Sequence, residues 1–195
     1  MSTAGLLLAA GAGRRFGRPK ALVELGGQPL ATRAVRALSD GGCEPVLVVL
    51  GARADDVRTL LPGRVGTVVA PDWEQGMSAS LRAGLHALTE RSPVPDAVLI
   101  HLVDLPGVGP EVVRRLRSRT GVDAVARATY GGMPGHPVLL GRRWWGEVAA
   151  AAHGDRGARE WLRGRDDVRL VECGDLAEGT DVDTPADLPG DDSRP

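Results

Sequence analysis

The chain has 195 residues, 43% of them hydrophobic, so it can bury the core of one α/β domain, and its apolar runs are too short to span a membrane. The formal net charge is -1 and only 3% of residues are aromatic, which argues against nucleic acid or an anionic membrane as a partner. Cys43 and Cys173 stand alone, and the apolar start at Leu6 lacks a basic leader region, so we expect a cytoplasmic protein.

The first predicted element is a short buried strand, residues 6–9, followed by a loop rich in glycine and basic side chains. A continuous apolar run of this length is typical of a strand covered on both faces. Glycines let backbone N–H groups approach an anion closely, and cations neutralise its charge, so the loop is predicted to bind phosphate. Its glycines and basic residues are Gly11, Gly13, Arg14, Arg15, Gly17, Arg18 and Lys20.

Two common phosphate-binding loops do not fit this spacing. The run from Gly11 to Gly17 is one residue longer than the dinucleotide-binding pattern G-x-G-x-x-G. Lys20 is followed by Ala21, where a Walker A loop has Ser or Thr. A glycine-rich turn with a structural role is the alternative at this point.

Helical and strand patterns alternate along the rest of the chain. Pro29 suits the first position of a helix that continues through Leu38 and ends before Gly41. The alternation predicts an α/β fold with a mostly parallel sheet. Further strands are predicted at 46–50, 65–69, 97–103 and 124–128, and helices at 55–61, 81–88, 112–116 and 142–152.

The segment 71–84 reads as a turn followed by a helix. Gly76 ends the turn, and Ser78 is predicted to cap the helix because its hydroxyl can accept a hydrogen bond from a free N–H group. By chemistry alone, Ser78 and Ser80 are as well explained by capping as by contact with a ligand.

Asp104 follows the predicted strand 97–103, and ligands of open α/β sheets gather at the carboxyl ends of strands. A carboxylate there would repel a triphosphate unless a divalent cation lay between them, and Mg²⁺ accepts carboxylate and phosphate oxygens as ligands. Capping of the next turn is the alternative. His101, on the same strand, is predicted to pack in the interior.

Two later segments interrupt the regular pattern. Turn residues crowd positions 131–137, where we expect a loop long enough to carry a second substrate, with His136 either contacting it or fixing the loop. Asp155 is predicted to cap a helix whose first N–H groups, at Gly157 and Ala158, would form an anion site. The alternative for this second segment is an ordinary capped helix.

The last informative segment is 181–188, D-V-D-T-P-A-D-L. Thr184 suits a helix N-cap, and Pro185 suits the first helical position. Capping requires neither Asp181 nor Asp183, so local structure leaves these two carboxylates unexplained.

Six segments, in this order, resemble the molybdenum-cofactor nucleotidyltransferases, which carry a MobA-like NTP transferase domain. They are the glycine loop, E-Q-G-M-S, V-D-L-P, P-G-H-P, G-D-R-G-A-R and D-V-D-T-P-A-D-L. Gln75 departs from the tighter E-G-M-S form, and the L-A-A-G of residues 8–11 is closer to the cytidylyltransferase branch than to the guanylyltransferase branch. The resemblance implies a three-layer α/β/α Rossmann-like fold. No linker divides the chain, so we expect one domain at 1–190 with a disordered tail at 191–195.

The resemblance implies transfer of a nucleotide, with CTP favoured as donor, onto the phosphate of a molybdopterin-type acceptor, releasing pyrophosphate. Arg14 and Lys20 would contact the β- and γ-phosphates. Asp104 and Asp183 would hold Mg²⁺, with Asp181 in support. The residues implied in nucleotide binding are Ala9, Ala10, Gly11, Ala12, Gly13, Lys20, Gly76, Ser78 and Ser80, and those implied in acceptor binding are Gly135, His136, Pro137, Gly157 and Arg159.

Other activities remain open within this resemblance. The donor could be GTP, and the acceptor could be a sugar phosphate or a deazaflavin-cofactor precursor, because the superfamily shares its donor half. Outside enzymes, the chain could carry molybdenum cofactor to a molybdoenzyme client. The presence of Lys20 and Asp104 favours the catalytic interpretation.

Overall fold

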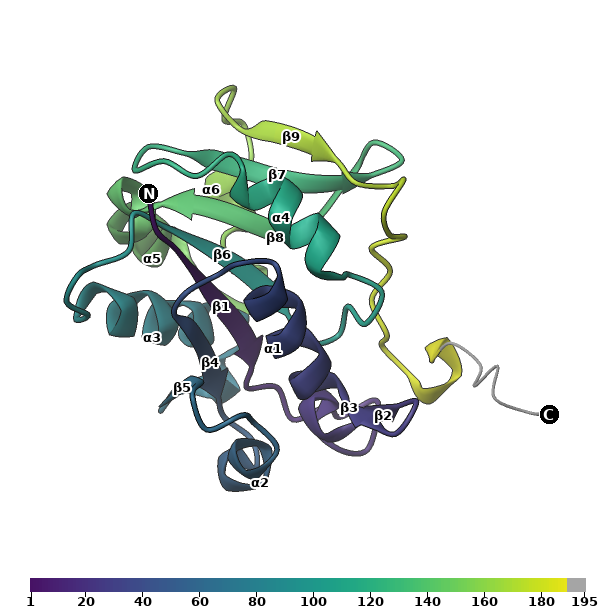
Figure 1. Ribbon diagram of the computed structural model, residues 1–195. Helices are drawn as coiled ribbons and strands as arrows, with labels where there is room; N and C mark the ends of the chain where they lie inside the picture. The colour runs from purple at the N-terminus through teal and green to yellow at the C-terminus, as the bar shows by residue number, and fades with distance from the viewer. Residues whose placement is uncertain (189–195) are drawn as a thin grey trace.

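A seven-stranded sheet forms the centre of the protein, whose computed structural model describes residues 1–188 (Figure 1). The strands lie in the order β5-β4-β1-β6-β8-β7-β9, and only β8 runs antiparallel to its neighbours. The predicted mostly parallel sheet is therefore confirmed. The strands are β1 (Thr3–Ala9), β4 (Val46–Leu50), β5 (Gly66–Val69), β6 (Ala97–Leu102), β7 (Val125–Tyr130), β8 (Met133–Gly141) and β9 (Arg169–Glu172); a separate short ribbon pairs β2 (Glu24–Leu25) with β3 (Gln28–Pro29).

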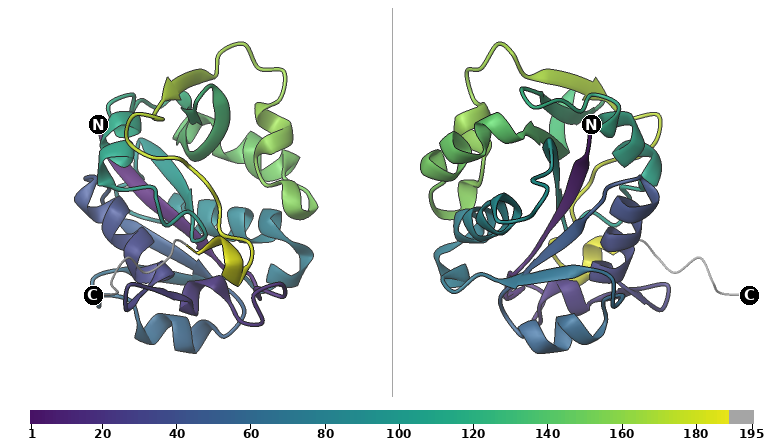
Figure 2. Two further views of the ribbon diagram at one scale, coloured as in Figure 1. Left: turned by 90° about the vertical axis from the view of Figure 1, so that its right-hand side faces the viewer. Right: turned by 60° about the vertical axis from the view of Figure 1, so that its left-hand side comes forward.

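Helices cover both faces of this sheet. The right panel of Figure 2 shows α1 and α4 on one side, and α3 with α5 on the other. Helix α1 begins at Leu30 rather than at Pro29, because Pro29 has an extended backbone (ψ 140°) and pairs with Glu24. The helices are α1 (Leu30–Asp40), α2 (Ala54–Thr59), α3 (Met77–Thr89), α4 (Pro110–Arg117), α5 (Trp145–Ala151) and α6 (Arg159–Leu162).

Alternation along the central strands divides the interior into two apolar cores. In β1, Leu7 and Ala9 belong to the core under α1 and α4, whereas Leu6 and Leu8 belong to the core under α3 and α5. This division follows from the two-residue period of a strand, and it explains why the strand is apolar at consecutive positions. The predicted three-layer α/β/α arrangement is confirmed.

His101, on the central strand β6, is a fully buried ionisable side chain. It is 0% exposed, and neither ring nitrogen has a hydrogen-bond partner among the described residues. Burial lowers its pKa to about 3, with the nearby His136 as a smaller cause. The imidazole is thus neutral and packed in the interior, as predicted.

The prediction that residues 131–137 form a loop is wrong. Gly131 and Gly132, with φ of 58° and 80°, form the tight turn of a hairpin, and the chain returns at once as strand β8. The two prolines that argue against a strand are accommodated because the pairing of β7 with β8 shifts register between Arg127 and Thr129. The prediction therefore mistook an irregular strand for a loop.

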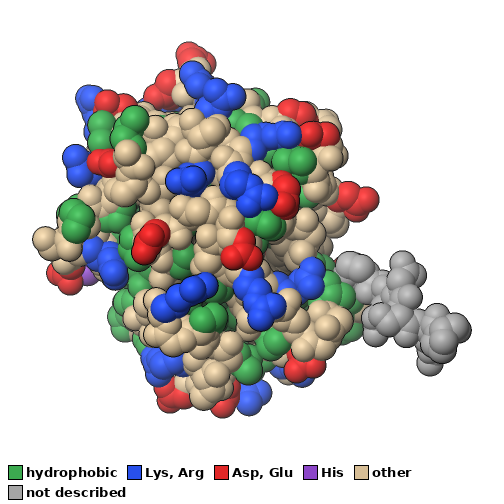
Figure 3. All heavy atoms as spheres, in the orientation of Figure 1, with side chains coloured by type: hydrophobic (Ala, Val, Ile, Leu, Met, Phe, Trp, Pro, Cys, Tyr) green, Lys and Arg blue, Asp and Glu red, His purple; other side chains and the backbone are tan. Residues whose placement is uncertain are grey.

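On the face seen in Figure 3, basic and acidic side chains are interspersed. Within residues 1–188, every helix is too short or too polar to cross a bilayer. The predicted tail at 191–195 and the last two residues of the predicted domain 1–190 lie outside the described residues.

Glu172, the last residue of β9, holds the β7–β8 hairpin closed. Its carboxylate accepts hydrogen bonds from the backbone N–H groups of Gly131 (2.9 Å), Gly132 (3.0 Å) and Gly174 (2.8 Å). The hydroxyl of Thr129 donates a fourth bond at 2.8 Å. These donors lower the pKa of Glu172 to about 2, with Gly174 as the largest contributor.

We expect Glu172→Gln to destabilise the fold, because a neutral amide accepts weaker hydrogen bonds and has one oxygen in place of two. In the wild type, the stabilisation by Glu172 is fully present above its unfolded pKa of 4.5 and is lost as the pH falls toward 2. Chemical unfolding between pH 3 and pH 7, followed by circular dichroism, measures both effects. Glu178→Gln, at an exposed carboxylate, is the matched control; equal stability of the two variants would contradict this role for Glu172.

Candidate functional site

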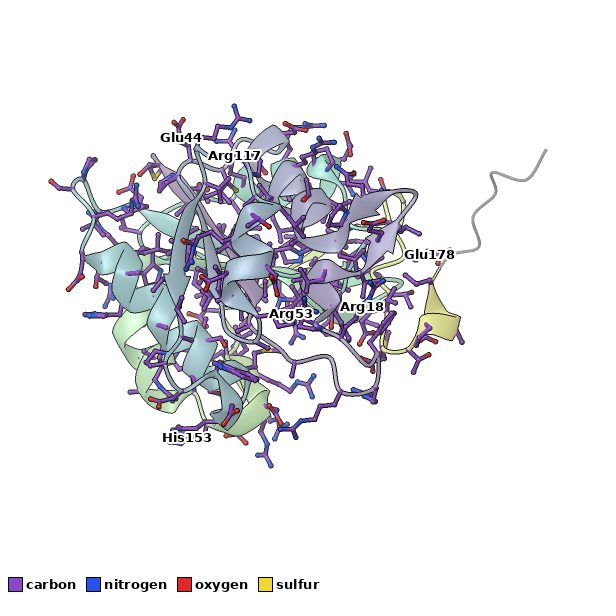
Figure 4. The ribbon with its side chains drawn as sticks, turned by 90° about the horizontal axis from the view of Figure 1, so that it is seen from below. Arg18, Glu44, Arg53, Arg117, His153 and Glu178 are labelled. Carbon is purple, nitrogen blue, oxygen red and sulfur yellow. The ribbon has the colours of Figure 1, made fainter. Side chains whose placement is uncertain are left out.

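A cavity of about 350 Å³ opens where β1 and β6 end and where α3 begins. Figure 4 shows this end of the molecule from below, with Arg18 of the glycine loop and Arg53 before α2 labelled. This position is the one expected for ligands of an open α/β sheet. The cavity is lined by Leu8, Ala10, Gly11, Ala12, Gly13, Arg14, Lys20, Trp73, Glu74, Gly76, Met77, Ser80, Leu102, Val103, Asp104 and Asp155.

The glycine loop folds back on itself beside the cavity. Gly13 has φ of +62°, and a Cβ atom there would lie 1.9 Å from the carbonyl oxygen of Arg18. Only glycine fits such a position. Of the residues predicted to bind nucleotide in this loop, Ala10 to Gly13 line the cavity, whereas Ala9 is buried in the opposite direction under α1 because side chains alternate along β1.

Lys20 joins three distant parts of the chain. Its Nζ donates to Oδ2 of Asp104 at 3.0 Å and to Oδ1 of Asp183 at 2.7 Å. Arg15 reaches the other oxygen of Asp183 at 2.9 Å. The segment after β9 is held here as well, since the N–H of Val182 donates to the carbonyl oxygen of Asp104. The structure thus brings together Lys20, Asp104 and Asp183, as the motifs predicted.

The charges in this cluster stabilise one another. Burial opposes the charge of Lys20, but its contacts with Asp183 and Asp104 outweigh burial and raise its pKa above the ordinary value. The hydrogen bond from Lys20, assisted by Arg15, lowers the pKa of Asp183 despite partial burial. An ammonium group therefore lies between two carboxylates near neutral pH.

The same two carboxylates fit a divalent cation. Oδ1 of Asp104 is buried and has no hydrogen-bond partner among the described residues. The two carboxylate oxygens of Asp183, on the segment after β9, accept hydrogen bonds from Lys20 and Arg15. Asp181 does not join them: it lines a second cavity, and residues 1–188 contain no group of three metal-ligating side chains. Asp181 is therefore not placed to support a metal ion held by Asp104 and Asp183, contrary to the prediction.

Helix α3 directs its first turn at the cavity. The helix begins at Met77 with Gly76 as the preceding residue, so the predicted N-cap role of Ser78 is wrong. Ser78 is 1% exposed, and its hydroxyl has no partner within the described chain, whereas Ser80 lines the cavity. Gly76 has φ of +104°, and a Cβ atom there would lie 2.4 Å from Oδ1 of Asp155. The free N–H groups of this helix start favour an anion.

Some residues of this cavity were not predicted. Trp73 directly precedes the E-Q-G-M-S motif, and Glu74 is the first residue of that motif; both line the cavity together with Gly76. Their only signal in the sequence is this motif. Asp155 reaches the cavity from a 3-10 turn (Gly154–Arg156) far along the chain, and no local pattern indicates this contact.

A second cavity, of about 230 Å³, adjoins the first. Of the residues predicted to bind the acceptor, Gly135, His136 and Arg159 line this cavity, whereas Pro137 and Gly157 are not part of its lining. Gly157 lies instead next to Met77, whose sulfur would be 3.1 Å from a Cβ atom on Gly157. Arg127, on β7, also lines this cavity and was not predicted.

The predicted capped helix after Asp155 is wrong. Residues Gly154–Arg156 form a 3-10 turn without a side-chain cap, and Gly157 follows with φ of 52°. Helix α6 begins only at Arg159 and has 4 residues. The positive φ at Gly157 separates the turn from the helix, so the N–H of Gly157 does not belong to a helix start.

His136 lies at the register shift of β8, with its backbone oxygen bonded to the hydroxyl of Tyr130 at 2.6 Å. Nδ1 of His136 is buried without a partner among the described residues. Burial, together with the smaller effects of the charges of Arg127 and Arg159, lowers the pKa of His136 to about 4. The side chain is therefore a neutral imidazole in the wall of the second cavity.

Comparison with known families gives a match over most of the chain. The family model described as a MobA-like NTP transferase domain matches residues 5–170. A nicotine blue oxidoreductase of Paenarthrobacter nicotinovorans is 38% identical over 92% of this chain and 91% of its own length. A molybdenum cofactor guanylyltransferase of Rhodobacter capsulatus is 38% identical over 60% of this chain and 58% of its own length.

Solved structures give the same fold. A nucleotidyl transferase from Methanothermobacter thermautotroptrophicus has a TM-score of 0.80 at 25% identity, covering 95% of this chain and 94% of its own. Rv0371c of Mycobacterium tuberculosis H37Rv, solved as a complex with manganese, has a TM-score of 0.73 at 27% identity, covering 88% of each chain.

Proposed function

Because this chain belongs to the family of MobA-like NTP transferase domains, we propose that it transfers a nucleotide from a nucleoside triphosphate to the phosphate of a molybdopterin-type acceptor. The observation that carries the proposal is the position of Lys20 between Asp104 and Asp183, beside a glycine loop and the start of α3. Cations, carboxylates and free N–H groups in one cavity suit a triphosphate and its counter-ion.

The proposed reaction is a displacement at phosphorus. A phosphate oxygen of the acceptor attacks the α-phosphorus, the bond from that phosphorus to the bridging oxygen of the β-phosphate breaks, and pyrophosphate leaves. An ionised phosphate needs no general base. Catalysis would therefore rest on positioning and on charge stabilisation.

The residues of the first cavity would share this work. Backbone N–H groups of the glycine loop and of the start of α3 would receive phosphate oxygens. Phosphates entering the cavity would draw Lys20 away from the carboxylates, and Lys20 with Arg14 would then neutralise the charge that accumulates on pyrophosphate. Asp104 and Asp183 would hold Mg²⁺, whose charge, when bound, offsets that of the triphosphate.

The choice of nucleotide is the finer part of the proposal. The L-A-A-G segment favours CTP, whereas the relatives named for molybdenum cofactor are guanylyltransferases, which favours GTP. Relatives named as cytidylyltransferases have 2-C-methyl-D-erythritol 4-phosphate as their named acceptor and match only about half of their own length. These two lines of evidence favour different donors, so pyrophosphate release is to be measured with CTP and with GTP.

A second candidate function is reduction of a dye-like substrate, favoured by the extended match to nicotine blue oxidoreductase. An oxidoreductase needs an electron donor, and the first cavity would accept a reduced nicotinamide nucleotide through the same phosphate contacts. In this case the chain would oxidise the nicotinamide nucleotide and release no pyrophosphate.

One experiment separates these functions. We expect pyrophosphate release from GTP or CTP that requires both molybdopterin and a divalent cation, tested with Mg²⁺ and Mn²⁺. Parallel reactions contain 2-C-methyl-D-erythritol 4-phosphate, or NADH or NADPH with nicotine blue. Oxidation of the nicotinamide without pyrophosphate release would support the oxidoreductase, and nucleotide and molybdopterin binding without turnover would support a carrier.

A further inference from the structure

Tyr130, the last residue of β7, is buried between two segments that line the second cavity. A Cβ atom on Gly135 would lie 2.9 Å from its ring, and a Cβ atom on Gly179 would lie 2.1 Å from it. Gly135 belongs to β8, whereas Gly179 belongs to the segment after β9, which is yellow in the left panel of Figure 2. Both glycines line the second cavity, but Tyr130 does not. The ring therefore supports this cavity from behind.

Side chains of β7 hold an irregular part of β8 that the sheet pairing leaves out. Residues 135–137 form a bulge, because they lie between two paired positions of β8 and face a single residue of β7. Such a bulge leaves backbone groups without partners in the ladder. The hydroxyl of Tyr130 donates to the carbonyl oxygen of His136 at 2.6 Å, and Arg127 donates to the two carbonyl oxygens before it. The position of the bulge thus depends on these side chains.

The segment after β9 depends on the same ring. Among the described residues, 178–181 make no hydrogen bond, and the next backbone bond of this segment runs from Val182 to Asp104. Gly179 has φ of 65° and packs directly against the ring of Tyr130. Asp183, which accepts a hydrogen bond in the first cavity, follows four residues later. The ring therefore fixes the path by which this segment reaches the first cavity.

The hydroxyl of Tyr130 keeps its proton near neutral pH. Burial raises the pKa of Tyr130 above its ordinary value of 10.0, and the nearby Cys173 and Glu172 raise it further. The hydroxyl is thus always available as a donor. Without this donor the carbonyl oxygen of His136 would lose the partner that compensates for its loss of water, which is unfavourable for a buried polar group.

We propose that Tyr130 is a positioning residue for both cavities: its hydroxyl fixes the bulge that lines the second cavity, and its ring fixes the segment that carries Asp183. This inference rests on the proposed function, because it takes the second cavity as the acceptor site and Asp183 as a cation ligand. Tyr130 lines neither cavity. It acts through Gly135, His136 and Gly179.

Replacing Tyr130 with phenylalanine keeps the ring and removes only the hydroxyl. We expect the KM for molybdopterin to rise about threefold to tenfold, the range for one lost hydrogen bond, while the KM for the nucleotide stays near that of the wild type. Ser118→Ala is the matched control, because it removes a hydroxyl that donates to a carbonyl oxygen away from both cavities. An equal rise of both KM values, or no rise in the folded variant, would overturn the positioning role.

Amide hydrogen exchange followed by NMR tests the role of the hydroxyl without turnover. Val138, the first residue after the bulge, pairs with both β6 and β7. In Tyr130→Phe we expect the exchange of its amide to accelerate at least about threefold relative to that of Leu7 in β1. Unchanged relative exchange at Val138 would show that the hydroxyl does not fix the bulge. The exchange rates do not depend on any substrate, so the positioning role and the proposed function can fail separately.

Gly179→Ala tests the contact with the ring, and it decides the matter if Tyr130→Phe does not fold. The added methyl group would overlap the ring, so the segment after β9 must shift and Asp183 must shift with it. A displacement of about 1 Å can lower a rate about 100-fold, and Mg²⁺ should strengthen nucleotide binding less than in the wild type. Gly164→Ala, at φ of 77° with open space around it, is the matched control. Calorimetry that finds the same Mg²⁺ dependence in both glycine variants would contradict the role of the ring.

Discussion

Replacing Lys20 with alanine should lower the rate of pyrophosphate release by about 100-fold to 1,000-fold, as is usual when one preorganised charge contact to a transition state is lost. Lys20 is the cation that the structure holds between Asp104 and Asp183 in the lining of the first cavity. Its raised pKa keeps it charged throughout the neutral range. Steady-state pyrophosphate release with saturating nucleotide and acceptor measures the effect.

The same variant has a second readout that does not need activity. Without Lys20, Asp104 loses the one ion pair that it makes among the described residues, and Asp183 keeps only Arg15. The two carboxylates then attract a free cation more strongly, so Mn²⁺ should bind the nucleotide-free Lys20→Ala variant more tightly than it binds the wild type. Titration followed by electron paramagnetic resonance of free Mn²⁺ measures this difference.

Two further variants control for charge and for the fold. Lys20→Arg keeps the charge and should restore part of the rate, although the planar guanidinium cannot reach both carboxylates in the same way. Arg18→Ala removes a cation from the same loop that does not line the cavity, and its rate should stay near that of the wild type. A Lys20→Ala variant that releases pyrophosphate as fast as Arg18→Ala would show that Lys20 has no catalytic role.

Replacing Asp104 with asparagine should reduce the rate by at least about 100-fold, since a lost hard-cation ligand weakens charge neutralisation at the phosphates. Asparagine keeps the shape of the side chain and can still accept the hydrogen bond of Lys20. It replaces one carboxylate oxygen with an NH₂ group and removes the negative charge of the carboxylate. The buried Oδ1, which has no partner among the described residues, belongs to that carboxylate. Calorimetric titration with GTP and CTP, with and without Mg²⁺, should show that Mg²⁺ no longer strengthens nucleotide binding.

Asp181→Asn is the matched control for this experiment, because Asp181 lies in the second cavity. Its nucleotide binding should keep the Mg²⁺ dependence of the wild type. If Asp104→Asn retained that dependence and Asp181→Asn lost it, the assignment of the cation site to Asp104 and Asp183 would be wrong.

Local sequence patterns predicted much of the fold, because the formation of buried strands and of helices depends mainly on residues close together in the chain. The apolar runs of β1, β4 and β6 indicate buried parallel strands, and their alternation with helices indicates the layers. Strand β8 escaped prediction because Pro134 and Pro137 are normally excluded from central strands. The pairing of β8 with β7 tolerates them because its register shifts between Arg127 and Thr129, and the pairing with β6 includes only residues from Val138 onward.

By itself, the sequence determined the α/β class, the glycine loop and the presence of Asp104 at the end of a strand, since each depends on neighbouring residues. Only the tertiary structure decided that Lys20 lies between carboxylates 84 and 163 positions away. It alone placed Asp181 in the second cavity and Arg127 beside Arg159 there. The physical reason is that these contacts join residues far apart in the sequence. They form only when the strands and the segment after β9 pack together, so the local sequence around each residue does not indicate them.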